Sequence, residues 1–218
     1  MNVTQRLKQE IIEVAKELLE KGLVVGTGGN LSICLREEGL ILITPSGIDY
    51  NQMVLEDIVI LDLQGNIVEG TRRPSVEKNM HLELYNARED ICAVIHTHSL
   101  YASAVAVTRE DLPVVLSEMA VVFGGAVRTA RYAKIGTKEL AENVLEVLGD
   151  SCAALLSNHG AVGVGKNLQD VLKICELLEI SAKVYILSKV AGSPVILSDE
   201  AIMQEKKHVQ AIYGQFIK

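Results

Sequence analysis

The sequence alternates segments of helical hydrophobic periodicity with short apolar runs, and several runs are joined by turns too short to hold a helix. The first segment has apolar residues at helical spacing from Leu7 to Leu18, and Gly22 is a suitable stop. Two pairs of runs flank tight turns: 31–35 with 40–44, and 58–63 with 67–69. We therefore expect an α/β fold in which helices pack on the faces of a central mixed, largely antiparallel sheet.

The rest of the chain continues this pattern. We expect further helices at 75–88, 100–107, 136–148, 168–190 and 199–218, and further strands at 92–98, 113–116, 126–130, 152–157 and 161–164. No internal repeat, linker or low-complexity segment interrupts the pattern. We therefore expect a single domain over residues 1–218.

Charge and composition argue against several classes of partner. The net charge is −7 with a pI near 5.3, and aromatic residues make up 4% of the chain with no Trp, so we expect no nucleic-acid partner. No apolar run is long enough to cross a membrane, and the N-terminal segment has the pattern of an amphipathic helix and not of a signal peptide. The four cysteines are widely scattered, so we expect reduced thiols and a cytoplasmic protein.

A pair of histidines closes one of the apolar runs. His96 and His98 follow the run 92–95, and alternate residues of a strand point to the same side, so the two imidazoles project together. Such a pair suits a divalent metal, because imidazole is the commonest neutral nitrogen ligand. Taken alone, the pair fits equally well two strand-end histidines that bind backbone or solvent.

A third histidine and a carboxylate extend this hypothesis. His159 follows the apolar run 153–156, and Glu77 comes just after Ser75, which is suited to cap a helix. Zn²⁺ takes three or four nitrogen, sulfur or oxygen ligands, so three histidines leave room for a carboxylate or a substrate. Taken singly, a histidine like His159 is more often structural, and Glu77 is more often a charge that complements the helix dipole.

Loops rich in Gly, Ser, Thr and Asn suggest an anion site. They lie at 27–30, at 44–47 and around Ser75, where glycine lets backbone N–H groups approach an anion and the polar side chains add donors. Ordinary turns share this composition. Two other motifs are rejected: the glycines at 26–28 lack the last Gly of a dinucleotide fingerprint, and the G-x-x-x-x-G-K at 160–166 is followed by Asn167 in place of Ser or Thr.

Five motifs in order carry a family resemblance: GTGGNLS, LITPSGI, PSVEKNMHLELY, AVIHTHS and SNHGAVGVG. From the first helix to Tyr213, the chain resembles the class II aldolase/adducin family. The resemblance implies a three-layer α/β/α sandwich around a mixed, mostly antiparallel sheet. It also implies a homotetramer with active sites at the subunit interfaces.

The resemblance implies a role for each matched residue. The expected ligands of one Zn²⁺ per subunit are His96, His98 and His159, with Glu77 as the catalytic carboxylate that can also ligate the metal. The residues that match the phosphate pocket are Gly29, Asn30, Ser46, Gly47 and Ser75. Tyr213 matches a C-terminal tyrosine that reaches the site of a neighbouring subunit.

The activity that the resemblance implies is a zinc-dependent lyase reaction on a small phosphorylated sugar. A ketose 1-phosphate, such as L-fuculose 1-phosphate, would be cleaved to dihydroxyacetone phosphate and an aldehyde. Glu77 would move the proton at C3 of the substrate.

Three positions depart from the pattern of the aldolases. Val76 stands where a second phosphate-binding Ser is expected, and Ile135 replaces an aromatic residue of the aldehyde pocket. Glu118 replaces a tyrosine that protonates the aldehyde oxygen, so it is the third expected catalytic residue. An acid at this place keeps open the dehydration of methylthioribulose 1-phosphate. The 4-epimerisation of L-ribulose 5-phosphate and a non-catalytic adducin-like module are further alternatives.

Overall fold

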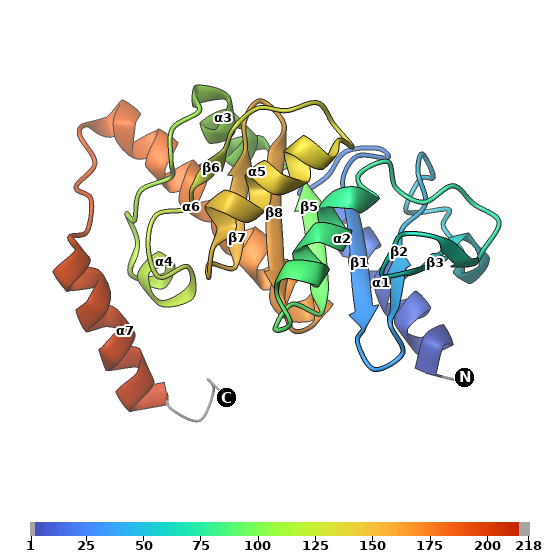
Figure 1. Ribbon diagram of the computed structural model, residues 1–218. Helices are drawn as coiled ribbons and strands as arrows, with labels where there is room; N and C mark the ends of the chain where they lie inside the picture. Colours follow the sequence, from blue (N-terminus) through green and yellow to red (C-terminus); the bar gives the residue numbers. More distant parts are fainter. Residues whose placement is uncertain (1–2, 214–218) are drawn as a thin grey trace.

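Eight strands of the described chain pair in one sheet, in the order β4-β3-β2-β1-β5-β8-β7-β6 (Figure 1). The computed structural model describes residues 3–213, without the side chains of residues 210 and 213. The strands are β1 (Asn30–Leu35), β2 (Leu40–Ile43), β3 (Val59–Asp62), β4 (Ile67–Glu69), β5 (Ala93–Thr97), β6 (Thr129–Ala130), β7 (Ala153–Leu156) and β8 (Gly160–Gly165). Only β6 and β7 pair in parallel, which confirms the expected mixed, mostly antiparallel sheet.

Helices cover both faces of this sheet. They are α1 (Val3–Glu20), η1 (Leu55–Asp57), α2 (Lys78–Ala87), α3 (Leu100–Thr108), α4 (Ser117–Val122), α5 (Lys138–Leu148), α6 (Leu168–Ala191) and α7 (Asp199–Tyr213). Helices α2 and α5 lie on one face, and α1 and α6 lie on the other (Figure 1). None of the helices within residues 3–213 is long and apolar enough to cross a membrane.

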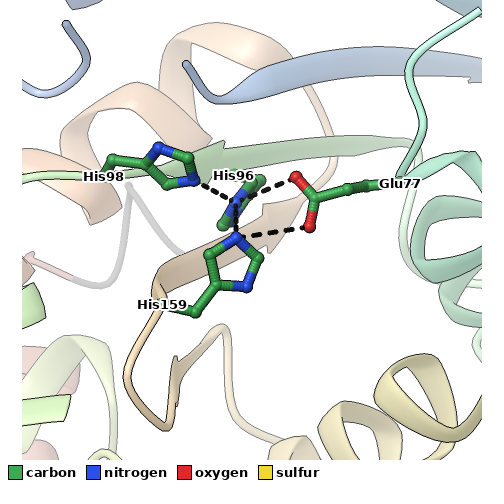
Figure 2. A group of neighbouring side chains, drawn as sticks. All are labelled: Glu77, His96, His98 and His159. Atoms are coloured by element: carbon green, nitrogen blue, oxygen red, sulfur yellow. Dashed lines mark hydrogen bonds and ion pairs between the residues drawn. The ribbon is translucent and has the colours of Figure 1, made fainter. Parts of the chain in front are cut away.

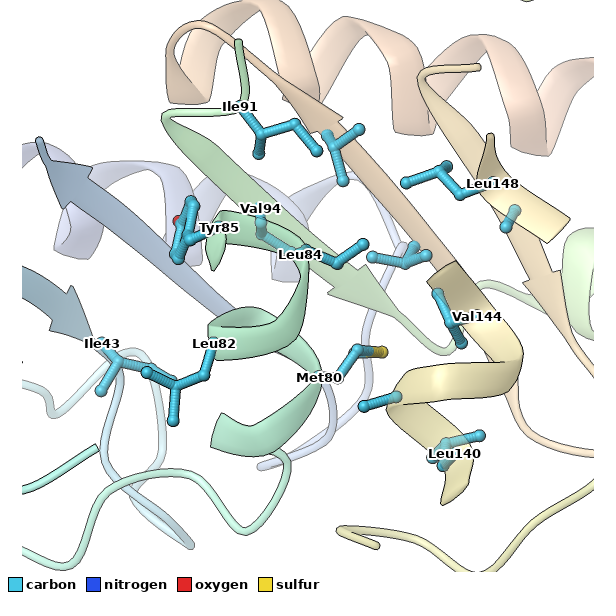
Figure 3. Packing of buried hydrophobic residues seen from close by; sticks show 14 of the residues in the cluster. Ile43, Met80, Leu82, Leu84, Tyr85, Ile91, Val94, Leu140, Val144 and Leu148 are labelled. Carbon is cyan, nitrogen blue, oxygen red and sulfur yellow. The ribbon is translucent and has the colours of Figure 1, made fainter. Parts of the chain in front are cut away.

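The central strand β5 contributes to the cores on both faces. Val94 packs with Leu84 of α2 and Val144 of α5, as Figure 3 shows, whereas Ile95 packs in the cluster formed with α1 and α6. Because the side-chain period of a strand is two, His96 points to the same face as Val94. The buried apolar pattern of β5 therefore directs His96 toward the layer that contains α2.

The expected strand at 113–116 is wrong, and a helix was missed beside it. Leu112 forms an isolated antiparallel bridge with Val127, but the next residue is Pro113, which has no N–H with which to continue a ladder. The carbonyl of Val114 instead accepts a hydrogen bond of 2.9 Å from the N–H of Leu197, in the segment that precedes α7. The chain then forms α4, which has only six residues and so carries little periodicity.

The expected strand at 126–130 is reduced to β6. Thr129 and Ala130 alone pair with β7 at the edge of the sheet. The preceding residues are used by the bridge of Val127 with Leu112. As the edge strand of the described sheet, β6 has a neighbouring strand on one side only. No described strand on its other side pairs with it to lengthen it.

Candidate metal centre

Four side chains from three separate parts of the fold meet at one end of the sheet (Figure 2). Glu77 immediately precedes α2, His96 lies in β5 with His98 just beyond it, and His159 lies in the turn between β7 and β8. One ligand atom from each residue can be chosen so that all lie within 4.8 Å of one another. The structure thus brings together the four residues that the sequence analysis placed at a metal.

His96 stands at the centre of the group. Its Nε2 atom lies 2.9 Å from Nε2 of His98, 3.2 Å from Nε2 of His159 and 3.1 Å from Oε2 of Glu77. Its Nδ1 atom lies 2.9 Å from the carbonyl oxygen of Ala161 in β8. A hydrogen on Nδ1 donates to that carbonyl, so in the neutral ring the lone pair on Nε2 faces the other three side chains.

Local backbone geometry holds His159 in place. Asn158 adopts a left-handed conformation with φ of 56°, and the N–H of His159 donates to the carbonyl of Leu156 at 3.0 Å. The next residue, Gly160, has no room for a side chain. A Cβ there would overlap the carbonyl oxygen of Thr97 and lie 3.3 Å from Cε1 of His96. The Asn-His-Gly sequence therefore makes a tight turn that turns the third imidazole back toward the first two.

The protonation states of the group suit a cation. Burial, reinforced by the charge on a neighbouring imidazole, lowers the pKa of His98 and of His159 to about 4, so both rings are neutral near pH 7. Burial alone would raise the pKa of Glu77, but His96, His159 and the amide of Asn30 together bring it well below its usual range. Neutral imidazoles beside an ionised carboxylate are the forms in which these groups ligate metals.

A buried polar atom supports the same conclusion. Oε1 of Glu77 has no hydrogen-bond partner among the described residues. Oε1 lies 3.5 Å from Nε2 of His159, a distance too long for a good hydrogen bond. Buried polar atoms normally have hydrogen-bond partners. A carboxylate oxygen that lacks one and lies beside imidazole nitrogens therefore fits a site for a divalent cation.

The loops expected to bind phosphate lie beside this group. The N–H of Ser75 donates to the carbonyl of Thr44, the N–H of Ser46 donates to the carbonyl of Arg73, and Pro45 bridges Pro74, so the two loops form one unit. The Ser75 hydroxyl accepts a hydrogen bond of 3.2 Å from the N–H of Glu77. The same unit thus positions Glu77 and presents the loop residues.

Two glycines of the expected phosphate pocket adopt conformations that favour glycine. Gly29 has φ of 74°, and a Cβ there would lie 2.6 Å from the carbonyl oxygen of His96. Gly47 has φ of 73° with open space around it. The first glycine therefore allows β1 to approach the metal centre closely, and the second leaves its backbone accessible.

Asn30, which is expected in the phosphate pocket, also contacts Glu77 and a fourth histidine, and its role toward phosphate stays a prediction. Its side-chain amide nitrogen donates to Oε2 of Glu77 at 2.9 Å, and its oxygen lies 2.5 Å from Nε2 of His81. The side chain is thus engaged by protein at both ends. The sequence analysis missed His81, although its position four residues after Glu77 at the start of a helix was a signal that the two face the same side.

Of the two other expected catalytic residues, Glu118 lies outside the group. Glu118 is an exposed residue of α4, a helix that packs against α7. Tyr213 is the last residue of α7, and its side chain lies outside the described residues. Their roles stay predictions.

Known proteins resemble this chain over most of its length. The family model described as "Class II Aldolase and Adducin N-terminal domain" matches residues 9–186. The chain is 41% identical over 211 residues to a 5-deoxy-D-ribulose 1-phosphate aldolase of Bacillus thuringiensis serovar kurstaki, covering 97% of this chain and 98% of that protein. It is 35% identical over 198 residues to the L-fuculose phosphate aldolase of Escherichia coli K12, covering 90% and 91%.

A solved structure is similar over almost the whole length. An L-fuculose 1-phosphate aldolase superposes with a TM-score of 0.91 at 45% identity and covers 94% of this chain and 96% of its own. A putative aldolase/epimerase/decarboxylase from Escherichia coli has a TM-score of 0.85 at 28% identity, covering 94% and 100%. The architecture and the sequence thus point to the same group of proteins.

Removal of one imidazole should release the metal. We expect His159→Gln to lower the affinity for a divalent cation by roughly 100-fold or more, because loss of an outer partner of a ligand already costs 10- to 100-fold. Metal analysis after dialysis against a weak chelator measures this. His208→Gln is the matched control, because His208 is exposed on α7. Equal metal retention in both variants would contradict the assignment.

Proposed function

Because the chain belongs to the class II aldolase and adducin family, we propose that it is a zinc-dependent aldolase that cleaves a ketose 1-phosphate to dihydroxyacetone phosphate and an aldehyde. The observation that carries the proposal is the convergence of His96, His98, His159 and Glu77 beside the loops at 44–47 and 73–75. The names of the similar proteins support a short ketose 1-phosphate as the substrate, with L-fuculose 1-phosphate and 5-deoxy-D-ribulose 1-phosphate as candidates.

The three imidazoles and Glu77 are the residues that would hold the metal. When bound, a divalent cation supplies Lewis-acid polarisation of the substrate carbonyl. We assign Zn²⁺ because nitrogen-rich sets of this kind suit it, with one ion per chain. The buried, unpartnered Oε1 of Glu77 supports the fit.

Glu77 would move the proton at C3 of the substrate. In the synthetic direction, the ionised carboxylate takes a proton from C3 of dihydroxyacetone phosphate, and the resulting carbon nucleophile forms the C3–C4 bond. In cleavage, the C4 hydroxyl would give its proton to a base, the role assigned to Glu118, as the C3–C4 bond breaks. Glu77, after taking up a proton from solvent, would give it to C3, so that the net change is the move of one proton from the C4 oxygen to C3. The pKa of Glu77 is lowered by His96, His159 and Asn30, so the carboxylate is ionised in the free protein, which is the form that can accept a proton.

The loops would anchor the phosphate away from the bond that breaks. Backbone N–H groups near Gly47 and the hydroxyls of Ser46 and Ser75 are the donors we assign to it, with Gly29 shaping the close approach of β1. Asn30 is also proposed to contact the phosphate, and its side-chain amide supports Glu77, because its nitrogen donates to the carboxylate. Anchoring at one end restricts the orientation of the reacting carbons.

Glu118 and Tyr213 would complete the site across an interface between copies. We propose a cytoplasmic homotetramer in which α4 and the end of α7 approach a neighbouring centre. The exposure of Glu118 supports this placement. Cys34, Cys92, Cys152 and Cys175 are all free, which suits a reducing compartment.

The direct test is product formation from a panel of ketose 1-phosphates. We expect dihydroxyacetone phosphate to be released from at least one of them, and a strong chelator to abolish the release until Zn²⁺ is restored. Product mass distinguishes cleavage from loss of water, which the acid at Glu118 keeps open as a second candidate, and from epimerisation. No chelator-sensitive turnover of any ketose phosphate would reject the proposal.

Glu77→Gln tests the proton transfer at C3. We expect turnover to fall by roughly 100- to 10,000-fold, because Gln keeps the shape of Glu but cannot act as a base. Binding of a phosphate-bearing inhibitor should survive, measured by calorimetry on protein of verified metal content. Near-normal turnover would reduce Glu77 to a residue that begins a helix.

Glu118→Gln tests the aldehyde half of the reaction. We expect cleavage to slow by roughly 10- to 100-fold, in the range of a lost acid or base, while exchange of the C3 proton of dihydroxyacetone phosphate with solvent is unchanged. Glu89→Gln is the control, since Glu89 is also exposed but lies in the turn between α2 and β5. An unaffected cleavage rate would show that Glu118 has no role in the chemistry.

A further inference from the structure

Three buried polar side chains behind the metal centre, those of His81, Ser32 and Tyr85, have no role in the chemistry described above, and Asn30 joins them to Glu77 in one chain of hydrogen bonds. His81 is fully buried in α2, with Nε2 at 2.5 Å from Oδ1 of Asn30 and Nδ1 at 2.6 Å from Oγ of Ser32. The hydroxyl of Tyr85, also fully buried, lies 2.7 Å from the same Oγ. Asn30 connects this chain to Oε2 of Glu77 at 2.9 Å.

The direction of each hydrogen bond follows from Glu77. An ionised carboxylate only accepts, so the amide nitrogen of Asn30 must face Glu77 and the amide oxygen must face His81. That oxygen also only accepts, so Nε2 of His81 must carry a hydrogen. Complete burial lowers the pKa of His81 to about 3, so the ring is neutral and Nδ1 is left as an acceptor.

Ser32 and Tyr85 fix this form of the ring. The Ser32 hydroxyl donates to Nδ1 of His81. The Tyr85 hydroxyl, which lies 2.7 Å from Oγ and 2.9 Å from the carbonyl oxygen of Ser32, then has two acceptors for its hydrogen. The His81 ring thus donates from Nε2 to Asn30 and accepts at Nδ1 from Ser32. These two neighbours determine its tautomer.

This chain of hydrogen bonds gives the two oxygens of Glu77 different surroundings. Oε2 accepts from Asn30 and faces Nε2 of His96 at 3.1 Å, whereas Oε1 has no hydrogen-bond partner among the described residues. A carboxylate free to rotate about its last bond would exchange the two oxygens, but the amide of Asn30 holds one of them. Oε1 has no protein donor within residues 3–213, so it would ligate the cation in the free protein and would exchange a proton once bound substrate displaces it.

We propose that His81 is a positioning residue which, through Asn30, holds Glu77 so that Oε1 is the oxygen that exchanges a proton with C3 of the substrate. This inference rests on the proposed aldolase function for its kinetic consequences. Within residues 3–213, the hydrogen bonds of the His81 ring go to Asn30 and Ser32 and to none of the four candidate metal ligands. An amide does not pass protons on, so the chain orients Glu77 and is not a proton relay.

The test uses two variants of nearly equal size. Gln and Met have side chains of the same length, but only Gln can place an N–H near the position of Nε2 of His81. Solvent exchange of the C3 proton of dihydroxyacetone phosphate, with no aldehyde present, reports proton transfer alone. We expect His81→Met to slow this exchange and kcat by roughly 10- to 100-fold, as a misplaced reacting group does, with KM and metal content little changed. We expect His81→Gln to recover most of the loss.

Four outcomes are distinguishable. Wild-type exchange in His81→Met, or equal losses in both variants, would overturn the inference while leaving the aldolase proposal intact. A fall in melting temperature with normal exchange in the folded fraction would show a packing role only. If His81→Met does not fold, Ser32→Ala removes the hydroxyl that fixes the tautomer and should slow exchange while retaining metal. Unchanged exchange in that variant would also count against the inference.

A measurement that needs no turnover tests the hydrogen-bond chain itself. In the metal-loaded protein with isotope-labelled histidine, nuclear magnetic resonance distinguishes a ring protonated at Nε2 from one protonated at Nδ1. We expect His81, identified by the signal lost in His81→Gln, to be protonated at Nε2 alone. A ring protonated at Nδ1 would overturn the inference even if the wild type cleaved no ketose phosphate.

Discussion

Three imidazole nitrogens and a carboxylate that meet within 4.8 Å repel one another through their lone pairs unless a cation or protons lie between them. A chain can hold such a group only on rigid supports, and here they are the paired strands β5, β8 and β1 and the start of α2. His96 is anchored by the carbonyl of Ala161, and His159 by a turn whose glycine permits the close approach. The sheet thus holds the four ligand side chains close together despite the repulsion between their lone pairs.

A second layer of polar side chains fixes the orientation of the first. His81, Asn30 and Ser32 are buried on the face of the sheet that α2 covers, where β1 presents alternate residues to that helix. A buried polar network is costly when any member lacks a partner, and here His81 and Asn30 are bonded at both ends. The free oxygen of Glu77 is the exception, and it lies where the chemistry would occur.

The failures of the sequence prediction have physical causes. Strands such as β5 and β7 were predicted because continuous apolar runs mark buried strands. The segment at 113–116 is also apolar, but Pro113 removes a ladder hydrogen bond and the carbonyl of Val114 pairs with the segment before α7. Periodicity records which side chains are buried, not which backbone groups pair. The six-residue α4 was missed because a segment of this length shows too little periodicity to be recognised.

The sequence alone determined the alternation of helices and strands, the residue types of the metal centre and their positions after apolar runs, since these depend on local periodicity and on the chemistry of single residues. Only the tertiary structure decided that His96, His98, His159 and Glu77 converge, because their convergence depends on the antiparallel pairing of β5 with β8. The same holds for the contacts of Asn30 with Glu77 and His81, which the sequence did not indicate. An amide side chain can donate and accept at once, and its partners are set by the neighbours that the strand register brings within reach.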